Sequence, residues 1–459
     1  MAGDHRRRAF VGLTISNLAR QPWSQVVGAY LTLLVASRTT SAVAISFALS
    51  AHRGIAAVLM PIIGRLSDRA TTRGGRRVPL IVGGTAVGGV TVMLMTRTNG
   101  YWPLVVAVVV TRIALQVASI GSVGVTPDVF GRSRWAKAVG AIAAIGFLPG
   151  LATLALIRAT WQQDDPSSWD ITFIVAGAGL LLGAFAVAVL VREAPATEEV
   201  AVIAAQGSWR DELDRVRAIP SGLHLLASVA LLAVAFAGIN RLLPVWARDE
   251  LHVGGAEFAS VSLVLLPVAA ALVPIGLWLG SRAHPRVLAI SAAIVGAVVT
   301  ALMTVVTGPT MFVILTGISI PLTVAAFASL APLFIPLFPK GDRLGQAWGM
   351  VVGPFGLATS LAGLASATVV DIVGTTDALW VISSVLLLAL AANLTRLRVP
   401  SGARTDVRGL LRKARDAGLG PGLFDGSVDL EDVLGVGAIP LEADDDPTSS
   451  PITPTSRER

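Results

Sequence analysis

Twelve apolar stretches of membrane length follow one another along the chain. A helix needs roughly 20 mostly apolar residues to cross a bilayer, and a spanning helix satisfies its own backbone hydrogen bonds there. Only 14% of residues are charged, whereas soluble domains carry about a quarter. The sequence therefore predicts an all-α membrane protein with twelve transmembrane helices. The expected spans are residues 9–36, 42–64, 78–97, 103–127, 136–158, 170–191, 221–246, 256–280, 286–307, 309–338, 345–370 and 376–396.

The segments between these stretches alternate between many and few cationic residues. The cation-rich segments are 6–8, 65–77, 132–137, 192–217, 282–286 and 340–343. Because loops rich in Lys and Arg remain cytoplasmic, the alternation predicts that both termini are cytoplasmic. Lysine is nearly absent beside abundant Arg, Ala, Gly and Val, which indicates a GC-rich bacterial genome and a bacterial plasma (inner) membrane. The N-terminus runs into the first span without a cleavage site, so we expect that helix to be retained.

A weak internal repeat divides the chain into two halves. Residues 126–141 and 335–350 follow the fourth and tenth expected spans, and Pro127, Arg134 and Gly140 recur in the second segment at an offset of 209. Two six-helix halves related by a parallel repeat are the plan of the major-facilitator transporters. The predicted parts are an N-terminal six-helix half (1–192), a cytoplasmic linker with an amphipathic helix (193–220), a C-terminal six-helix half (221–398) and a largely disordered cytoplasmic tail (399–459).

Residues 61–77 read PIIGRLSDRATTRGGRR. They resemble the loop between spans 2 and 3 of major-facilitator transporters, roughly G-x-L-x-D-R-x-G-R-R. The longer form, SDRATTRGGRRVPLIVGG, is most similar to the glycoside–pentoside–hexuronide symporters and the related sucrose symporters. The resemblance covers about residues 9–398 and implies alternating-access transport of a sugar, a glycoside or a sugar-like organic anion. Proton-coupled efflux of a drug or metabolite, and transport of a lysolipid or lipid head group, remain open.

The resemblance also implies a cytoplasmic gate. In the family the Asp of this loop caps the N-terminus of span 11, which here places Asp68 near residues 345–347. A carboxylate at a helix N-terminus gains about 0.3–1 kcal/mol from the helix dipole. Alternatively, each arginine only keeps its loop on the cytoplasmic side of the membrane and takes no part in a gate. The predicted gate residues are Gly64, Asp68, Arg69, Arg76, Arg77 and Asp128.

Span 2 departs from the melibiose-type members of this group. Those members carry two acidic residues that bind the coupling cation, and this chain has Ala56 and Met60 at the matching positions. The resemblance thus implies no sodium site of that design. His52 and Arg53 share the same helical face. His52 is the only mid-span group whose unperturbed pKa lies near neutrality, so it is either the carrier of a coupled proton or a structural hydrogen-bonding residue.

Three arginines fall inside expected spans, namely Arg20, Arg53 and Arg112. A charge in the bilayer costs at least ~2.5 kcal/mol, so it normally faces a wet cavity or a partner. Acidic residues occur only near span ends, so these guanidinium groups invite an anionic or polyhydroxy ligand. Hydrogen bonding of Arg53 to carbonyls of a neighbouring span is the alternative. The candidate substrate-binding residues are Arg20, Gln21, Trp23, Gln25, His52, Arg53, Arg112, Gln116 and Trp348.

The remaining polar and aromatic residues of the spans carry weaker signals. We expect Asn240 and Arg241, which lie nearer the outer face, to belong to an outer gate. The tryptophans expected at the membrane interface are Trp102, Trp161, Trp169, Trp246 and Trp380.

Several functional classes are excluded by what the chain lacks. It has no cysteine, no cluster with metal-ligand spacing, no phosphate-binding glycine loop and only short external loops. We therefore expect a protein that is not an enzyme and uses no cofactor, metal or nucleic acid. The expected partners are a small solute, membrane lipids and protons, and the expected state is a monomer.

Overall fold

The computed structural model describes residues 2–69, 75, 77–130, 148–162, 165–192, 217, 222–280, 284–334 and 344–396, and its regular secondary structure in these ranges is helical. The first helices are α1 (Ala2–Gln25), the π-helix η1 (Val26–Tyr30), α2 (Leu31–Ala36), α3 (Ala42–Arg69), α4 (Val78–Met95), α5 (Tyr101–Phe130), an apolar helix at Leu148–Thr160, η2 (Pro166–Trp169) and α7 (Asp170–Leu190). The later helices are α10 (Gly222–Ala237), α11 (Ile239–Asp249), α12 (Gly255–Gly280), α13 (Pro285–Leu302), η3 (Met303–Val305), α14 (Pro309–Phe334), α15 (Leu344–Val373) and α16 (Ala378–Leu394).

These helices confirm the predicted all-α membrane fold. Each of the twelve predicted spans overlaps a helix, and seven helices in the described part are long and apolar enough to cross a bilayer. Two spans are less regular than expected. Five π-helical residues divide the first span, and a break at Gly238 separates α10 from α11 in the seventh.

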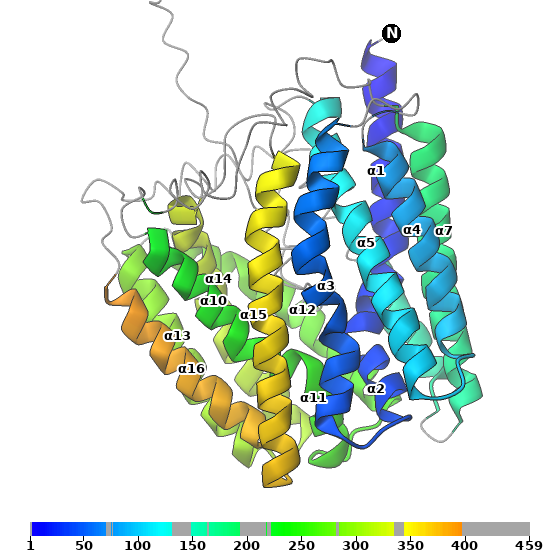
Figure 1. Ribbon diagram of the computed structural model, residues 1–459. Coiled ribbons are helices and arrows are strands. Elements are labelled where there is room, and N and C mark those ends of the chain that lie inside the picture. The colour runs from blue at the N-terminus through cyan, green and yellow to red at the C-terminus, as the bar shows by residue number, and fades with distance from the viewer. Residues whose placement is uncertain are drawn as a thin grey trace, which may run out of the picture.

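The helices gather in two groups that follow chain order (Figure 1). Helices α1 to α7, in blue and cyan, form the N-terminal helix group, and α10 to α16, in green to orange, form the C-terminal helix group. Extensive packing of α3 against α15 joins the groups, and α11 adds contacts to η1, α2 and α3. The interface between the groups therefore includes α3, α5, α11 and α15.

Glycines let helices within a group approach closely. A Cβ atom on Gly179 of α7 would collide with the Ala19 carbonyl of α1, and one on Gly84 of α4 with the Ala114 carbonyl of α5. Membrane helices commonly associate through such small residues. On the outside of the bundle, large apolar side chains such as Phe185 and Val385 are exposed, as expected of a surface that faces lipid.

Candidate functional site

The two helix groups meet where α3 begins and α15 ends. We call this the outer end, following the orientation predicted from the arginines. The Asp371 carboxylate, near the end of α15, accepts hydrogen bonds from Ser41 Oγ (2.8 Å), Ala42 N (2.8 Å) and Val43 N (3.1 Å). The first backbone N–H groups of a helix have no partner within that helix. Asp371 therefore caps α3 from the opposite helix group.

An aromatic contact closes the outer end at a second place. The Tyr30 hydroxyl of η1 donates to the Gly255 carbonyl at the start of α12 (3.2 Å). Tyr30 also packs on Trp161 at 4.8 Å between ring centroids, and Trp161 stacks on Trp169 at 4.7 Å. A Cβ atom on Gly255 would collide with the Trp161 indole. Only glycine lets the two groups come this close here.

Most of the tryptophans expected at the membrane interface lie inside the protein, so that prediction is wrong for them. Trp161, Trp169, Trp246 and Trp380 are buried, whereas Trp102 is 65% exposed. Trp246 packs edge-on against Trp380 at 4.9 Å and donates from Nε1 to Asp377 Oδ1 (2.9 Å). Indoles gain more from burying their large apolar area when a partner accepts the N–H.

A second zone of contact lies near mid-membrane, which we call the central layer. Arg53 Nη1 of α3 donates to Thr359 Oγ1 of α15 (2.8 Å), and Ser360 Oγ donates to the Ser50 carbonyl (3.1 Å). Arg53 is 11 residues beyond the first residue of α3, which is about 16 Å at 1.5 Å per residue. That is about half of a ~30 Å hydrocarbon core.

Arg241 enters the same layer from the C-terminal helix group. The break at Gly238 brings the backbone near α15, where an added Cβ would lie 2.8 Å from Ser366 Cβ. One turn later, the Arg241 guanidinium covers Gly363 so closely that a Cβ there would overlap it. Helical side chains lean toward the helix N-terminus, so Arg241 reaches back toward mid-membrane. Gly363 is four residues after Thr359 and lies on the same face of α15.

His52 and Arg112 complete a set of four residues. His52 is 1% exposed, and its Nδ1 atom has no hydrogen-bond partner among the described residues. Arg112, Arg53 and Arg241 lie near enough to His52 to interact electrostatically with its ring. Arg112 is 11 residues into α5, a depth of about 16 Å that matches that of Arg53. We name His52, Arg53, Arg112 and Arg241 the central cationic cluster.

The contact between α3 and α5 explains the position of Arg112. Ala56 packs against Ile120 in a small apolar cluster. Arg112, Gln116 and Ile120 follow one face of α5 at intervals of four residues, and this face meets α3. Ala56 is thus a packing position between helices.

The described contacts of the candidates on α1 are with other residues than those of this cluster. An added Cβ on Gly150 would lie 3.1 Å from Gln25 Nε2 and 3.9 Å from Gln21 Oε1, so both amides face the helix Leu148–Thr160. Trp23 is buried in the main apolar core. Arg20 is partly buried and is not among the described charges that act on His52.

The predicted cytoplasmic gate lies largely outside the described residues. The backbones of Gly64, Asp68 and Arg69 form the end of α3, and that of Asp128 the end of α5, but their side chains are outside this range. Arg77 is buried directly before α4. Several other predicted parts also lie outside the described residues. They are Arg76, the linker except residue 217, the tail, and both repeat segments except residues 126–130 and 344–350. Trp348 is in the first turns of α15, with its side chain outside it.

Arg241 was predicted for an outer gate and not for the substrate site, and Thr359 and the cap made by Asp371 were not predicted for either. Sequence position placed Arg241 near the outer face, and only the backward lean of its side chain brings it to the centre. Two features of the sequence could have indicated this position: the length of the arginine side chain, and the place of Arg241 one turn after Gly238. Thr359 gave no signal, because its role depends on the pairing of α3 with α15.

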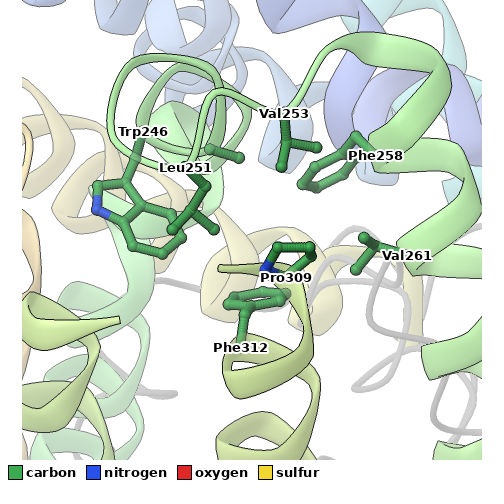
Figure 2. A pocket seen from close by; sticks show the side chains of 8 residues that line it. Trp246, Leu251, Val253, Phe258, Val261, Pro309 and Phe312 are labelled. Atoms are coloured by element: carbon green, nitrogen blue, oxygen red, sulfur yellow. The ribbon is translucent and has the colours of Figure 1, made fainter. Parts of the chain in front are cut away.

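One further pocket lies outside the central layer. Figure 2 shows its lining by Trp246, Leu251, Val253, Phe258, Val261, Pro309 and Phe312, and Ala247 completes it. The lining has no charged residue, so the pocket offers no group that would bind a polar solute. Among the described residues, no group of three His, Asp or Glu side chains could hold a metal ion.

Comparisons with known proteins agree with this architecture. The model of the Major Facilitator Superfamily matches residues 15–337. The structure is similar to those of a D-xylose–proton symporter (TM-score 0.63, 18% identity, covering 87% of this chain and 99% of that one) and the nucleoside transporter NupG (0.60, 15%, 84% and 98%). It is also similar to a bacterial homologue of the human lysosomal transporter Spinster (0.63, 15%, 93% and 98%). No curated protein sequence matches the chain.

Two helix groups that enclose a polar layer at mid-membrane define a multi-pass membrane transporter. The chain belongs to the Major Facilitator Superfamily, since the family model covers more than half of it. It is therefore a transporter of a small-molecule substrate and not an enzyme.

Proposed function

We propose that the protein is a secondary active transporter of a small polar solute, namely a sugar, a glycoside or a sugar-like organic anion. The observation that carries the proposal is the central cationic cluster. Arg53 and Arg112 come from the N-terminal helix group and Arg241 from the C-terminal one. A solute held by residues of both groups links its binding to their relative movement, which is what alternating access requires.

Closure of the outer end supports the same mechanism. The Asp371 cap and the contact of Tyr30 with Gly255 both join the two groups at that end. For the solute to enter there, both must break while α3 and α15 separate. We propose that Asp68, with the neighbouring arginines and Asp128, forms the opposing gate at the cytoplasmic end.

The finer parts of the proposal follow the sequence. The loop at 61–77 supports the glycoside–pentoside–hexuronide and sucrose-type subgroup, and the arginine distribution supports a bacterial inner-membrane location with both termini cytoplasmic. We take residues 1–192 and 221–398 as the moving halves of a monomer, joined by 193–220. His52 is the candidate carrier of a coupled proton because imidazole titrates near neutral pH.

Uptake by the purified protein in lipid vesicles tests the function. We expect saturable uptake of at least one sugar, glycoside or sugar acid, accelerated by an inward proton gradient and insensitive to sodium. The variant His52→Gln should lose gradient-driven accumulation and retain exchange of solute across the membrane. Uptake no faster than in protein-free vesicles would contradict the proposal.

The direction of the gradient response separates the alternatives. Solute expelled against an inward proton gradient would indicate efflux by antiport. Movement of a lysolipid between leaflets, without uptake of any water-soluble solute, would indicate the lipid alternative.

A further inference from the structure

The central layer has an unbalanced charge. No Asp or Glu occurs within residues 5–67, 69–127, 215–248 or 343–370, the segments that supply this layer. Three guanidinium groups nevertheless act on one buried histidine there. Charged side chains at mid-membrane normally pair with one another or line a functional pathway. A neutral ligand would leave this excess of positive charge unchanged.

We propose that the central cationic cluster binds an oxyanion, a carboxylate or phosphate carried by the transported solute. This inference rests on the proposed function and narrows its substrate class. The guanidinium fork matches both oxyanions in bidentate geometry. The solute is therefore an anion, and its charged end binds in the central layer.

The face of α15 at Thr359 and Gly363 brings the two helix groups to one site. Arg53 donates to Thr359 from α3, and the Arg241 guanidinium lies over Gly363 from α11. These two positions are one helical turn apart, about 6 Å along the axis. An oxyanion between them is within reach of an arginine from each group. The glycine at position 363 leaves room for the Arg241 guanidinium, because any side chain there would occupy the same place.

His52 supplies an independent sign of a ligand. Buried polar atoms in proteins nearly always have a hydrogen-bond partner, and His52 Nδ1 makes no hydrogen bond of normal geometry among the described residues; its ring has only a weaker contact with the Leu49 backbone. His52 precedes Arg53 directly in α3. A bound oxyanion, or the hydroxyl group beside it, provides the missing partner.

Matched ligand pairs on the wild-type protein test the proposal. Thermal unfolding of the purified full chain is measured at constant ionic strength with a hexose against its uronic acid and against its phosphate, and with glycerol against glycerol phosphate. Inorganic phosphate and acetate serve as minimal probes. We expect the oxyanion-bearing member of at least one pair to raise the melting temperature with an affinity at least tenfold above its neutral partner.

Variants then assign the effect to the cluster. Arg241→Gln should weaken binding of the stabilising anion about tenfold or more, and Arg241→Lys by less, because the charge remains but the fork is lost. Arg38→Gln is the matched control, since Arg38 is exposed in an outer loop and donates to the Thr98 carbonyl (3.3 Å). An unchanged affinity in Arg241→Gln, measured on protein that unfolds cooperatively like the wild type, would overturn the assignment.

One further measurement determines whether the oxyanion belongs to a lipid head group or to a free solute. A lysophospholipid that binds more tightly than glycerol phosphate places the oxyanion on a lipid head group, whereas the reverse order places it on a free solute. Equal binding of neutral and anionic partners, or no binding of any anionic probe, overturns the proposal. If neutral sugar is still taken up into vesicles in that case, the proposed transport function stands although the oxyanion site does not. Failure of the oxyanion site is therefore distinguishable from failure of the proposed function.

Discussion

The outer end and the central layer join the same two helices with opposite chemistry. At the outer end, the Asp371 carboxylate accepts from Ser41, directly before α3, and from two N–H groups of α3, and the Tyr30 hydroxyl has its own acceptor. The central layer instead gathers guanidinium groups where the sequence offers no carboxylate. The outer contacts pair a carboxylate and a hydroxyl with donors and acceptors of the protein, whereas the central layer gathers three cations that we propose to bind an anionic ligand. One zone therefore suits closure and the other suits binding.

Removal of a central cation should have the largest effect. Arg53→Gln takes away a charge that also bridges α3 to Thr359. A charged hydrogen bond contributes roughly 1.5–3 kcal/mol, so we expect the transport efficiency kcat/KM to fall about tenfold to a hundredfold. Uptake in vesicles measures it, with Arg38→Gln as the control that should transport normally. Normal transport by Arg53→Gln would contradict the view that the central layer binds the solute while the outer end serves closure.

Weakening the outer cap should have an intermediate effect. Asp371→Asn keeps one acceptor oxygen but loses the charge, at a cost to the closed outer end of about 1–2 kcal/mol. The chain has no cysteine, so Ser360→Cys provides a single reporter buried between α3 and α15. We expect an impermeant thiol reagent to label it from outside about tenfold faster when Asp371→Asn is added.

Asp165→Asn is the matched control for the cap. Asp165 is exposed at the outer end and accepts from Ser167, its neighbour in the same loop, so it bridges no helix groups. These hydrogen bonds lower the pKa of its carboxyl group. Labelling should be unchanged in this variant. If both carboxylate variants accelerate labelling equally, the cap does not hold the outer end closed.

The neutral contact at the outer end should matter less. Tyr30→Phe removes one hydrogen bond, to Gly255, and keeps the ring on Trp161. Such a bond contributes about 1 kcal/mol, so labelling of the same reporter should rise only a few-fold. A rise larger than that of Asp371→Asn would show that the aromatic contact is the main closure.

The smallest effect is expected in the apolar pocket beside Trp246. Val261→Ala shortens one apolar side chain of its lining, which contains no residue of the central cationic cluster. We expect anion affinity in the thermal-unfolding assay to stay within twofold of wild type. A larger loss would mean that the ligand extends to this pocket.

The sequence predicts the helices well because bilayer thickness and hydropathy determine them. It does not predict the π-helix at Val26–Tyr30 or the break at Gly238, since both depend on neighbouring helices. His52, Arg53 and Arg112 were identifiable because a charge inside a span is costly wherever it points. Arg241 and Thr359 join them only through the packing of α11 and α3 on α15. Asp371 was visible as an acidic residue at a span end, but its partner at the start of α3 was not.

The oxyanion site is tested most directly by vesicle uptake of one matched pair of ligands. The pair chosen is the one whose anionic member stabilises the protein most strongly. The two members share one sugar and differ only by the oxyanion. We expect saturable uptake of the anionic member and at least tenfold slower uptake of the neutral one. Equal rates, or faster uptake of the neutral member, would contradict an oxyanion site in the central layer.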